Sequence, residues 1–174
     1  MTFLALLRWL GLESRKLYCY EYRIDPQSLE DTITIGKGIK HHMAGAEVFG
    51  KEGFAPLCRT RALAVIMPDM KHCGGLLEGK KIAAVAELDG VAVSPHNPSG
   101  PVATAASVQL CASLSNVSIL EFAWGEVPWR AELINPPEEF VMGRIRVPDG
   151  PGFGIKLNDK EVARRAQGRK SLSS

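Results

Sequence analysis

Residues 91–106 read VAVSPHNPSGPVATAA, and this stretch combines the pattern of a strand, a turn and a helix. The run Val91–Val93 is short and apolar, and the small residues after Gly100 favour a helix. His96 lies between them, in a turn bounded by prolines. A single histidine in such a setting is most often a hydrogen-bonded loop or core residue. A functional role for His96 therefore depends on what ends the other strands.

The same strand-then-helix pattern recurs along the chain. Apolar runs predict five strands, each bounded to within about three residues, at 17–21, 43–47, 64–69, 91–95 and 118–121. The segments between them predict helices at 26–36, 52–60, 75–90 and 100–114. Short apolar strands that alternate with helices are typical of a parallel α/β sheet.

The repeat has a nearly constant length. One strand and one helix together take about 25 residues, which fits a βα barrel, whose eight units take about 250 residues. An open doubly wound sheet is the alternative, but such a sheet usually carries a Gly-rich phosphate loop after its first strand, and the first run is not followed by one. We therefore expect an α/β fold that forms part of a parallel (β/α)8 barrel.

An ionisable residue stands at the end of every predicted strand. These residues are Glu21, Glu47, Asp69, His96 and Glu121. The C-terminal ends of parallel strands converge on the mouth of a barrel, where catalytic groups lie. This shared position favours a functional role for all five. The alternative for Glu21 and Glu47 is that they cap helices, because the helix dipole favours a carboxylate there.

Composition limits the partners that we expect. Hydrophobic residues make up 45% of the chain, charged residues 23%, and the net charge of +2 gives no reason to expect nucleic acid. The apolar start predicts a short helix at 1–14, too short for the roughly 20 residues of a membrane span. The four cysteines have no C-x-x-C spacing, which favours reduced thiols in a cytoplasmic protein. We expect the basic tail, 161–174, to fray.

Several motifs resemble one known family. They are YEYRIDPQ (20–27), AGAEVFGKEGF (44–54), IMPDMKHCGGLLEGKKIAAVAE (66–87), VSPHNPSGPVATAAS (93–107), ILE (119–121) and GRIRVPDGPGFGIKL (143–157). Together they resemble the mandelate racemase/muconate lactonizing enzyme branch of the enolase superfamily, and most closely its acid-sugar dehydratases of the galactonate dehydratase type. The resemblance covers roughly residues 15–160, and its most specific parts are PD-x-x-x-x-GG and PHNPSGP.

The resemblance implies a role for each of the five strand-end residues. Glu21 and Glu47 would be two of three acidic Mg²⁺ ligands. Asp69 would orient His96, which would act as the base, and Glu121 would lie beside the substrate. The implied reaction removes the proton next to the carboxylate of a sugar acid and then expels a β-hydroxyl. Its enediolate intermediate carries negative charge that a magnesium ion stabilises.

The resemblance also implies parts that this sequence does not contain: a capping domain, the first three barrel strands and the third magnesium ligand. We therefore expect a truncated family member, inactive alone, with a partial barrel at 15–135 and a segment at 136–160 that would pack on a cap. The alternative is an active racemase or dehydratase half that another chain completes by supplying strands one to three and the cap. Five strands of eight leave two open sheet edges, so we expect self-association or a complementing fragment.

Overall fold

The computed structural model describes residues 20–21, 28–36, 42–44 and 48–170. The chain divides into two compact units. The first contains Met1–His96 and Leu114–Leu120, and the second contains Asn97–Ser113 and Glu121–Ser174. The helix expected at 1–14 lies outside the described residues. No helix in the described part of the chain is both long enough and apolar enough to span a membrane.

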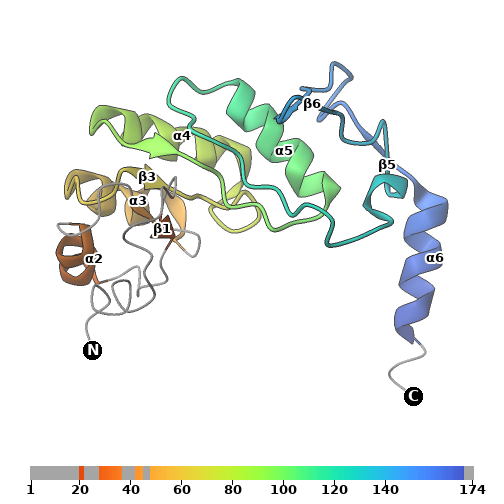
Figure 1. Cartoon of the computed structure of the whole chain (residues 1–174), viewed down its shortest axis with the longest axis horizontal. Helices are drawn as coiled ribbons and strands as arrows, with labels where there is room; N and C mark the ends of the chain where they lie inside the picture. The colour runs from red at the N-terminus through yellow and green to blue at the C-terminus, as the bar shows by residue number, and fades with distance from the viewer. Residues whose placement is uncertain (1–19, 22–27, 37–41, 45–47, 171–174) are drawn as a thin grey trace. The chain divides into compact units, whose positions relative to one another are not determined.

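A parallel sheet forms the centre of the first unit (Figure 1). It contains β1 (Tyr20–Glu21), β2 (His42–Ala44), β3 (Val65–Ile66) and β4 (Ala92–Val93), in that spatial order. The register aligns Ala44 with Ile66, and Ile66 with Val93. The parallel α/β organisation expected from the sequence is therefore confirmed, although the regular strands are shorter than the apolar runs.

The fifth predicted strand is reduced to one parallel bridge, between Val117 and Val93. The backbone N–H of Ser118 still donates to the Val93 carbonyl, at 2.9 Å. The N–H of Ile119, however, donates to the side-chain oxygen of Ser94, at 3.3 Å. A buried hydroxyl thus replaces the next ladder bond, and regular pairing ends there.

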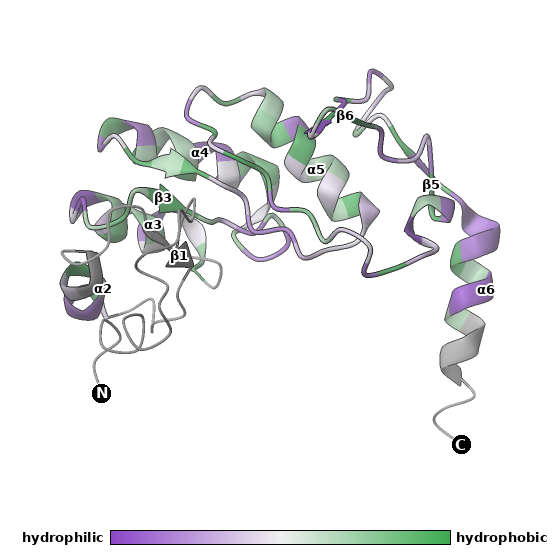
Figure 2. Cartoon of the chain, in the orientation of Figure 1, coloured by the Kyte–Doolittle hydropathy of each residue, from purple (hydrophilic) through white to green (hydrophobic). Residues whose placement is uncertain are grey.

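Among the described residues, three helices accompany this sheet: α2 (Leu29–Gly36), α3 (Gly50–Arg59) and α4 (Gly75–Leu88). The buried face of α4 has helical spacing, with Gly79, Ile82, Ala83 and Ala86 inside. The helix stops at the Asp89-Gly90 pair, where Gly90 has a φ of 71°. Ile66 and Val93 are fully buried in the sheet, and Figure 2 shows β3 in the hydrophobic colour.

Glu78 of α4 takes the place of an N-terminal cap on α3. Phe49 precedes α3 and offers no side-chain cap. The Glu78 carboxylate of α4 instead accepts the Lys51 backbone N–H, at 2.9 Å, and the Gly50 N–H donates to the Cys73 carbonyl, at 3.2 Å. These bonds satisfy donors that the first turn of a helix otherwise leaves open. Two successive βα repeats are thereby held together.

The second unit combines helices with short antiparallel pairs. Its elements are α5 (Pro101–Ala112), η2 (Arg130–Glu132), β5 (Ile134–Asn135), β6 (Phe140–Val141), β7 (Arg144–Ile145), β8 (Lys156–Leu157) and α6 (Asp159–Lys170). β5 pairs with β8, and β6 pairs with β7. Met142 and Gly143 turn the β6–β7 hairpin with φ values of 49° and 75°, the signature of a tight two-residue loop.

Within the described residues, the basic tail is helical, since α6 extends to Lys170, whereas residues 171–174 of the tail expected to fray lie outside them. Asn158 precedes the helix, and its side-chain oxygen accepts the Glu161 N–H, at 3.5 Å. Arg165 contacts Glu132 of η2 at 2.6 Å and lies over the Trp129 ring, 4.0 Å from its centroid. Basic residues that suggest a solvated end therefore tie the helix to the rest of the unit.

The loop 148–154 provides a stability test. Gly152 and Gly154 both have positive φ, at 67° and 72°. A Cβ on Gly152 would meet nothing, whereas a Cβ on Gly154 would collide with Pro148. We expect Gly152→Ala to cost about 1 kcal/mol from backbone strain alone, and Gly154→Ala about 3 kcal/mol because overpacking adds to that strain. Chemical denaturation measures both, and equal losses would contradict the assigned contact.

Candidate acid–base site

The parallel register brings two ionisable residues to the same level of the sheet. Ile66 of β3 is aligned with Val93 of β4. Asp69 follows Ile66 by three residues, and His96 follows Val93 by three residues. Parallel neighbouring strands therefore deliver a carboxylate and an imidazole to adjacent places, both within the first unit.

Asp69 is buried and hydrogen-bonded. Only 1% of its surface is exposed. Its Oδ1 accepts the backbone N–H of Lys71, at 2.7 Å, and its backbone carbonyl accepts the N–H groups of His72 and Cys73, at 2.9 and 2.7 Å. The Lys71 ammonium lies 3.4 Å from Oδ2. A buried carboxylate is costly unless it is bonded in this way.

His96 completes the pair. Its Nδ1 lies 3.0 Å from Oδ2 of Asp69, and 19% of its side chain is exposed. An ionised carboxylate only accepts hydrogen bonds, so Nδ1 carries the proton and the basic lone pair of the neutral ring is on Nε2. The arrangement of a buried carboxylate behind a partly exposed imidazole suits a general base.

The other three predicted residues fall elsewhere. Glu21 is the last residue of β1 and is aligned with Met43, but its side chain is outside the described residues. Glu47 is also outside them. Glu121 belongs to the second unit, where its Oε2 accepts the Asn97 backbone N–H, at 2.9 Å. The structure thus brings Asp69 and His96 together, and the roles predicted for the remaining three stay predictions.

A polar network around Glu121 was missed by the sequence reasoning. It involves Asn97, Thr104 and Arg130, and the first two are almost fully buried. The signal available was the asparagine inside PHNPSGP, because a buried amide needs fixed partners. Those partners come from distant parts of the chain, so the sequence could not name them.

The cysteines offer no reactive nucleophile in the described part of the chain. Cys58, Cys73 and Cys111 are free thiols. Burial is the main cause that raises the pKa of each thiol to about 11. Because the thiolate is the nucleophilic form, these thiols are inert near neutral pH. Among the same residues, no three His, Cys, Asp or Glu side chains gather in a metal-binding group.

A parallel α/β protein with an Asp–His pair at its strand ends is the class that fold and site define. The chain belongs to the enolase C-terminal domain-like family, whose sequence profile matches residues 4–162. The family expected from the motifs is therefore confirmed.

Several relatives are enzymes with named substrates, and two of them illustrate the match. The chain is 35% identical over 130 residues to a D-galactonate dehydratase of Pectobacterium atrosepticum. The matched region covers 71% of this chain and 34% of that protein. It is 32% identical over 148 residues to a D-galactarolactone cycloisomerase of Agrobacterium fabrum, covering 80% and 39%. The chain thus spans less than half the length of these relatives.

Solved structures of the same family are similar to this chain. A mandelate racemase/muconate lactonizing enzyme-like protein from Rubrobacter xylanophilus has a TM-score of 0.82 and 30% identity, covering 92% of this chain and 41% of that one. An enolase from Agrobacterium radiobacter, solved with bound Na and L-malate, has a TM-score of 0.76 and 27% identity, covering 84% and 41%.

The Asp69–His96 contact can be tested by replacing the acceptor that faces His96 with a donor. In Asp69→Asn, the Lys71 N–H still needs an acceptor at the Oδ1 position, so the amide NH2 faces His96. We expect the ring to switch from the Nδ1–H to the Nε2–H tautomer, which ¹⁵N NMR of the imidazole detects. Asp89→Asn, at the end of α4, is the control and should change nothing. An unchanged His96 spectrum in Asp69→Asn would refute the contact.

Proposed function

We propose that this chain is the C-terminal part of an acid-sugar dehydratase, with His96 as the base that removes the proton next to the substrate carboxylate. The observation that carries this proposal is the 3.0 Å contact between His96 and the buried Asp69, on successive parallel strands. The named relatives support sugar acids as the substrate class. The strands of the first unit would correspond to strands four to eight of a (β/α)8 barrel.

The chemistry follows from the pair. The Nε2 of His96 accepts the α-proton, and the electrons of the C–H bond move into the substrate carboxylate to give an enediolate. Asp69 stabilises the imidazolium that forms. The same imidazolium then returns its proton to the β-hydroxyl, which leaves as water while the enediolate electrons form the C=C bond of an enol. Glu121, in this proposal, lies beside the substrate.

Glu21 and Glu47 would hold a magnesium ion. Carboxylate oxygens are the hard ligands that Mg²⁺ prefers. Glu21 is the last residue of β1, Glu47 follows the end of β2 in the sequence, and these two strands are parallel neighbours. The donor types therefore fit the ion. When bound, Mg²⁺ would supply electrostatic stabilisation of the enediolate oxygens. The Na and L-malate in the Agrobacterium radiobacter enolase support a cation and a carboxylate in this fold.

The 174 residues alone are expected to be inactive, because they match only 34–39% of the two named relatives. The remaining barrel strands, the third ligand and a cap over residues 136–160 would come from elsewhere, in one alternative from another chain. The name of the cycloisomerase relative favours a second candidate reaction, the cycloisomerisation of a sugar-acid lactone. The free thiols of the described cysteines support the expected cytoplasmic location.

Turnover tests the assignment. We expect no dehydration of sugar acids by the chain alone with Mg²⁺, and restored dehydration after co-expression with the N-terminal part of the Pectobacterium atrosepticum relative. His96→Asn should then lower the rate by about 10³-fold, because a general base is lost. His72→Asn, which alters an exposed histidine next to the site, is the matched control.

Each result has a clear reading. Turnover by the chain alone would contradict its inactivity. Turnover that His96→Asn leaves intact would contradict the assignment of the base.

Open sheet edges predict the state in solution. Within the described residues, no strand pairs with the outer side of β1, and the opposite edge is the Val117 bridge. Unpaired edges and exposed apolar surface favour association. We expect sedimentation velocity to show oligomers of the chain, or a complex with a complementing fragment. A monodisperse 18.9 kDa monomer with a sharp melting transition would be the contrary result.

A further inference from the structure

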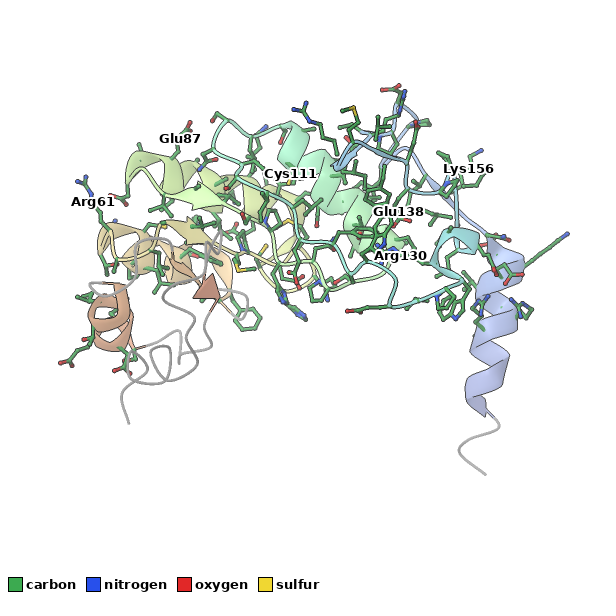
Figure 3. The ribbon with its side chains drawn as sticks, viewed as in Figure 1. Arg61, Glu87, Cys111, Arg130, Glu138 and Lys156 are labelled. Carbon is green, nitrogen blue, oxygen red and sulfur yellow. The ribbon has the colours of Figure 1, made fainter. Side chains whose placement is uncertain are left out.

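Arg130 occupies the centre of a buried network in the second unit. Its guanidinium donates to the Thr104 hydroxyl at 2.6 Å, to Glu138 at 2.9 Å and to the Ser99 carbonyl. It also lies over the Phe122 ring, 4.5 Å from the centroid. Figure 3 shows the Arg130 and Glu138 side chains next to each other. Both side chains are largely buried, at 12% and 8% exposure, so the pair neutralises two charges that would otherwise be costly.

The Thr104 hydroxyl connects Arg130 to Asn97 through hydrogen bonds. Thr104 is fully buried and Asn97 is 1% exposed. The hydroxyl accepts hydrogen bonds from the Arg130 guanidinium and from the side-chain Nδ2 of Asn97, at 2.6 and 2.9 Å. It donates to the side-chain Oδ1 of Asn97, at 3.3 Å. A hydroxyl has one proton and two lone pairs. Its whole bonding capacity is therefore used between these two residues.

Asn97 in turn fixes Glu121. Its backbone N–H donates to the Glu121 carboxylate, at 2.9 Å, and its side-chain amide donates to the Glu121 backbone carbonyl, at 3.0 Å. Phe122, the next residue, lies under the guanidinium of Arg130. The segment that carries Glu121 is thus held on one side through Asn97 and on the other through Phe122.

We propose that Arg130 is a positioning residue that sets the orientation of the Glu121 carboxylate through Thr104 and Asn97. The proposal rests on the role suggested above for Glu121. An arginine is required because its planar fork serves the Thr104, Ser99 and Glu138 oxygens at once and stacks on Phe122, whereas a lysine offers one point charge. Because the network is buried, a missing member leaves its partners without bonds.

The test reads the Asn97 backbone amide by hydrogen exchange resolved to single residues, on the whole chain and without substrate. Thr104→Val keeps the shape and removes the hydroxyl, and we expect it to lower Asn97 protection about tenfold or more, the size of a lost buried hydrogen bond. Thr104→Ser, which keeps the hydroxyl, should rescue protection to within about twofold. Arg130→Met and Arg130→Lys should both behave like Thr104→Val.

Two controls separate positioning from general destabilisation. Arg164→Met alters an exposed arginine of α6 that also pairs with glutamates, and should leave Asn97 unchanged. Amides of α4 should keep their protection in every variant. Glu121→Ala should expose the Asn97 amide as Thr104→Val does, and the two substitutions together should add little more, since both break one chain of bonds.

Three outcomes would overturn the positioning role: an unchanged Asn97 amide in Thr104→Val or in Arg130→Met, a Thr104→Ser variant as unprotected as Thr104→Val, or equal losses throughout the chain. Turnover is not part of this readout. A failed dehydration assay with the expected exchange pattern would therefore count against the proposed function alone. Dehydration that depends on His96, with no exchange change in Thr104→Val, would count against the positioning role alone.

Discussion

Parallel pairing of β3 with β4 sets Ile66 beside Val93, and the candidate site follows from this register. Asp69 and His96 stand three residues beyond that pair, so their contact depends on it. A slip of one residue would turn each following side chain to the opposite face. The full burial of Ile66 and Val93 makes such a slip costly. The apolar core therefore fixes the geometry of a polar site.

The two units stabilise their functional loops differently. In the first unit, the Asp69 carboxylate accepts the backbone N–H of Lys71, and the Asp69 carbonyl accepts the N–H groups of His72 and Cys73, so the residue is held by the turn that contains it. In the second unit, the Glu121 carboxylate accepts the backbone N–H of Asn97, and Asn97 itself is held by side chains from α5 and η2. Bonds within one turn tolerate substitution of neighbouring side chains. A side-chain network does not, because each of its members serves two others.

Exposed charge has a structural role in α6. A helix with basic residues and few buried groups is marginal by itself, yet α6 is anchored by Asn158 at its start and by Arg165 against Trp129 and Glu132. Pairs between Glu161 and Arg164 add local support within the helix. The basic composition that predicts a frayed end instead supplies the contacts that keep the helix in place.

The sequence by itself determined the parallel α/β organisation, because the alternation of apolar runs with amphipathic segments requires that strands pair side by side across helices. It also placed Asp69 and His96 at equivalent points of two repeats, and its motifs identified the family. The sequence did not determine the length of the last strand, because the Ser94 hydroxyl replaces a backbone group as the acceptor where that pairing ends. It also did not determine the Arg130 network. In that network, Arg130 and Thr104 are 26 residues apart in the sequence, and Glu121 and Asn97 are 24 residues apart. The local pattern of apolar residues indicates where strands and helices repeat along the chain. The partners of a buried polar group, by contrast, come from distant segments that only the folded chain brings together.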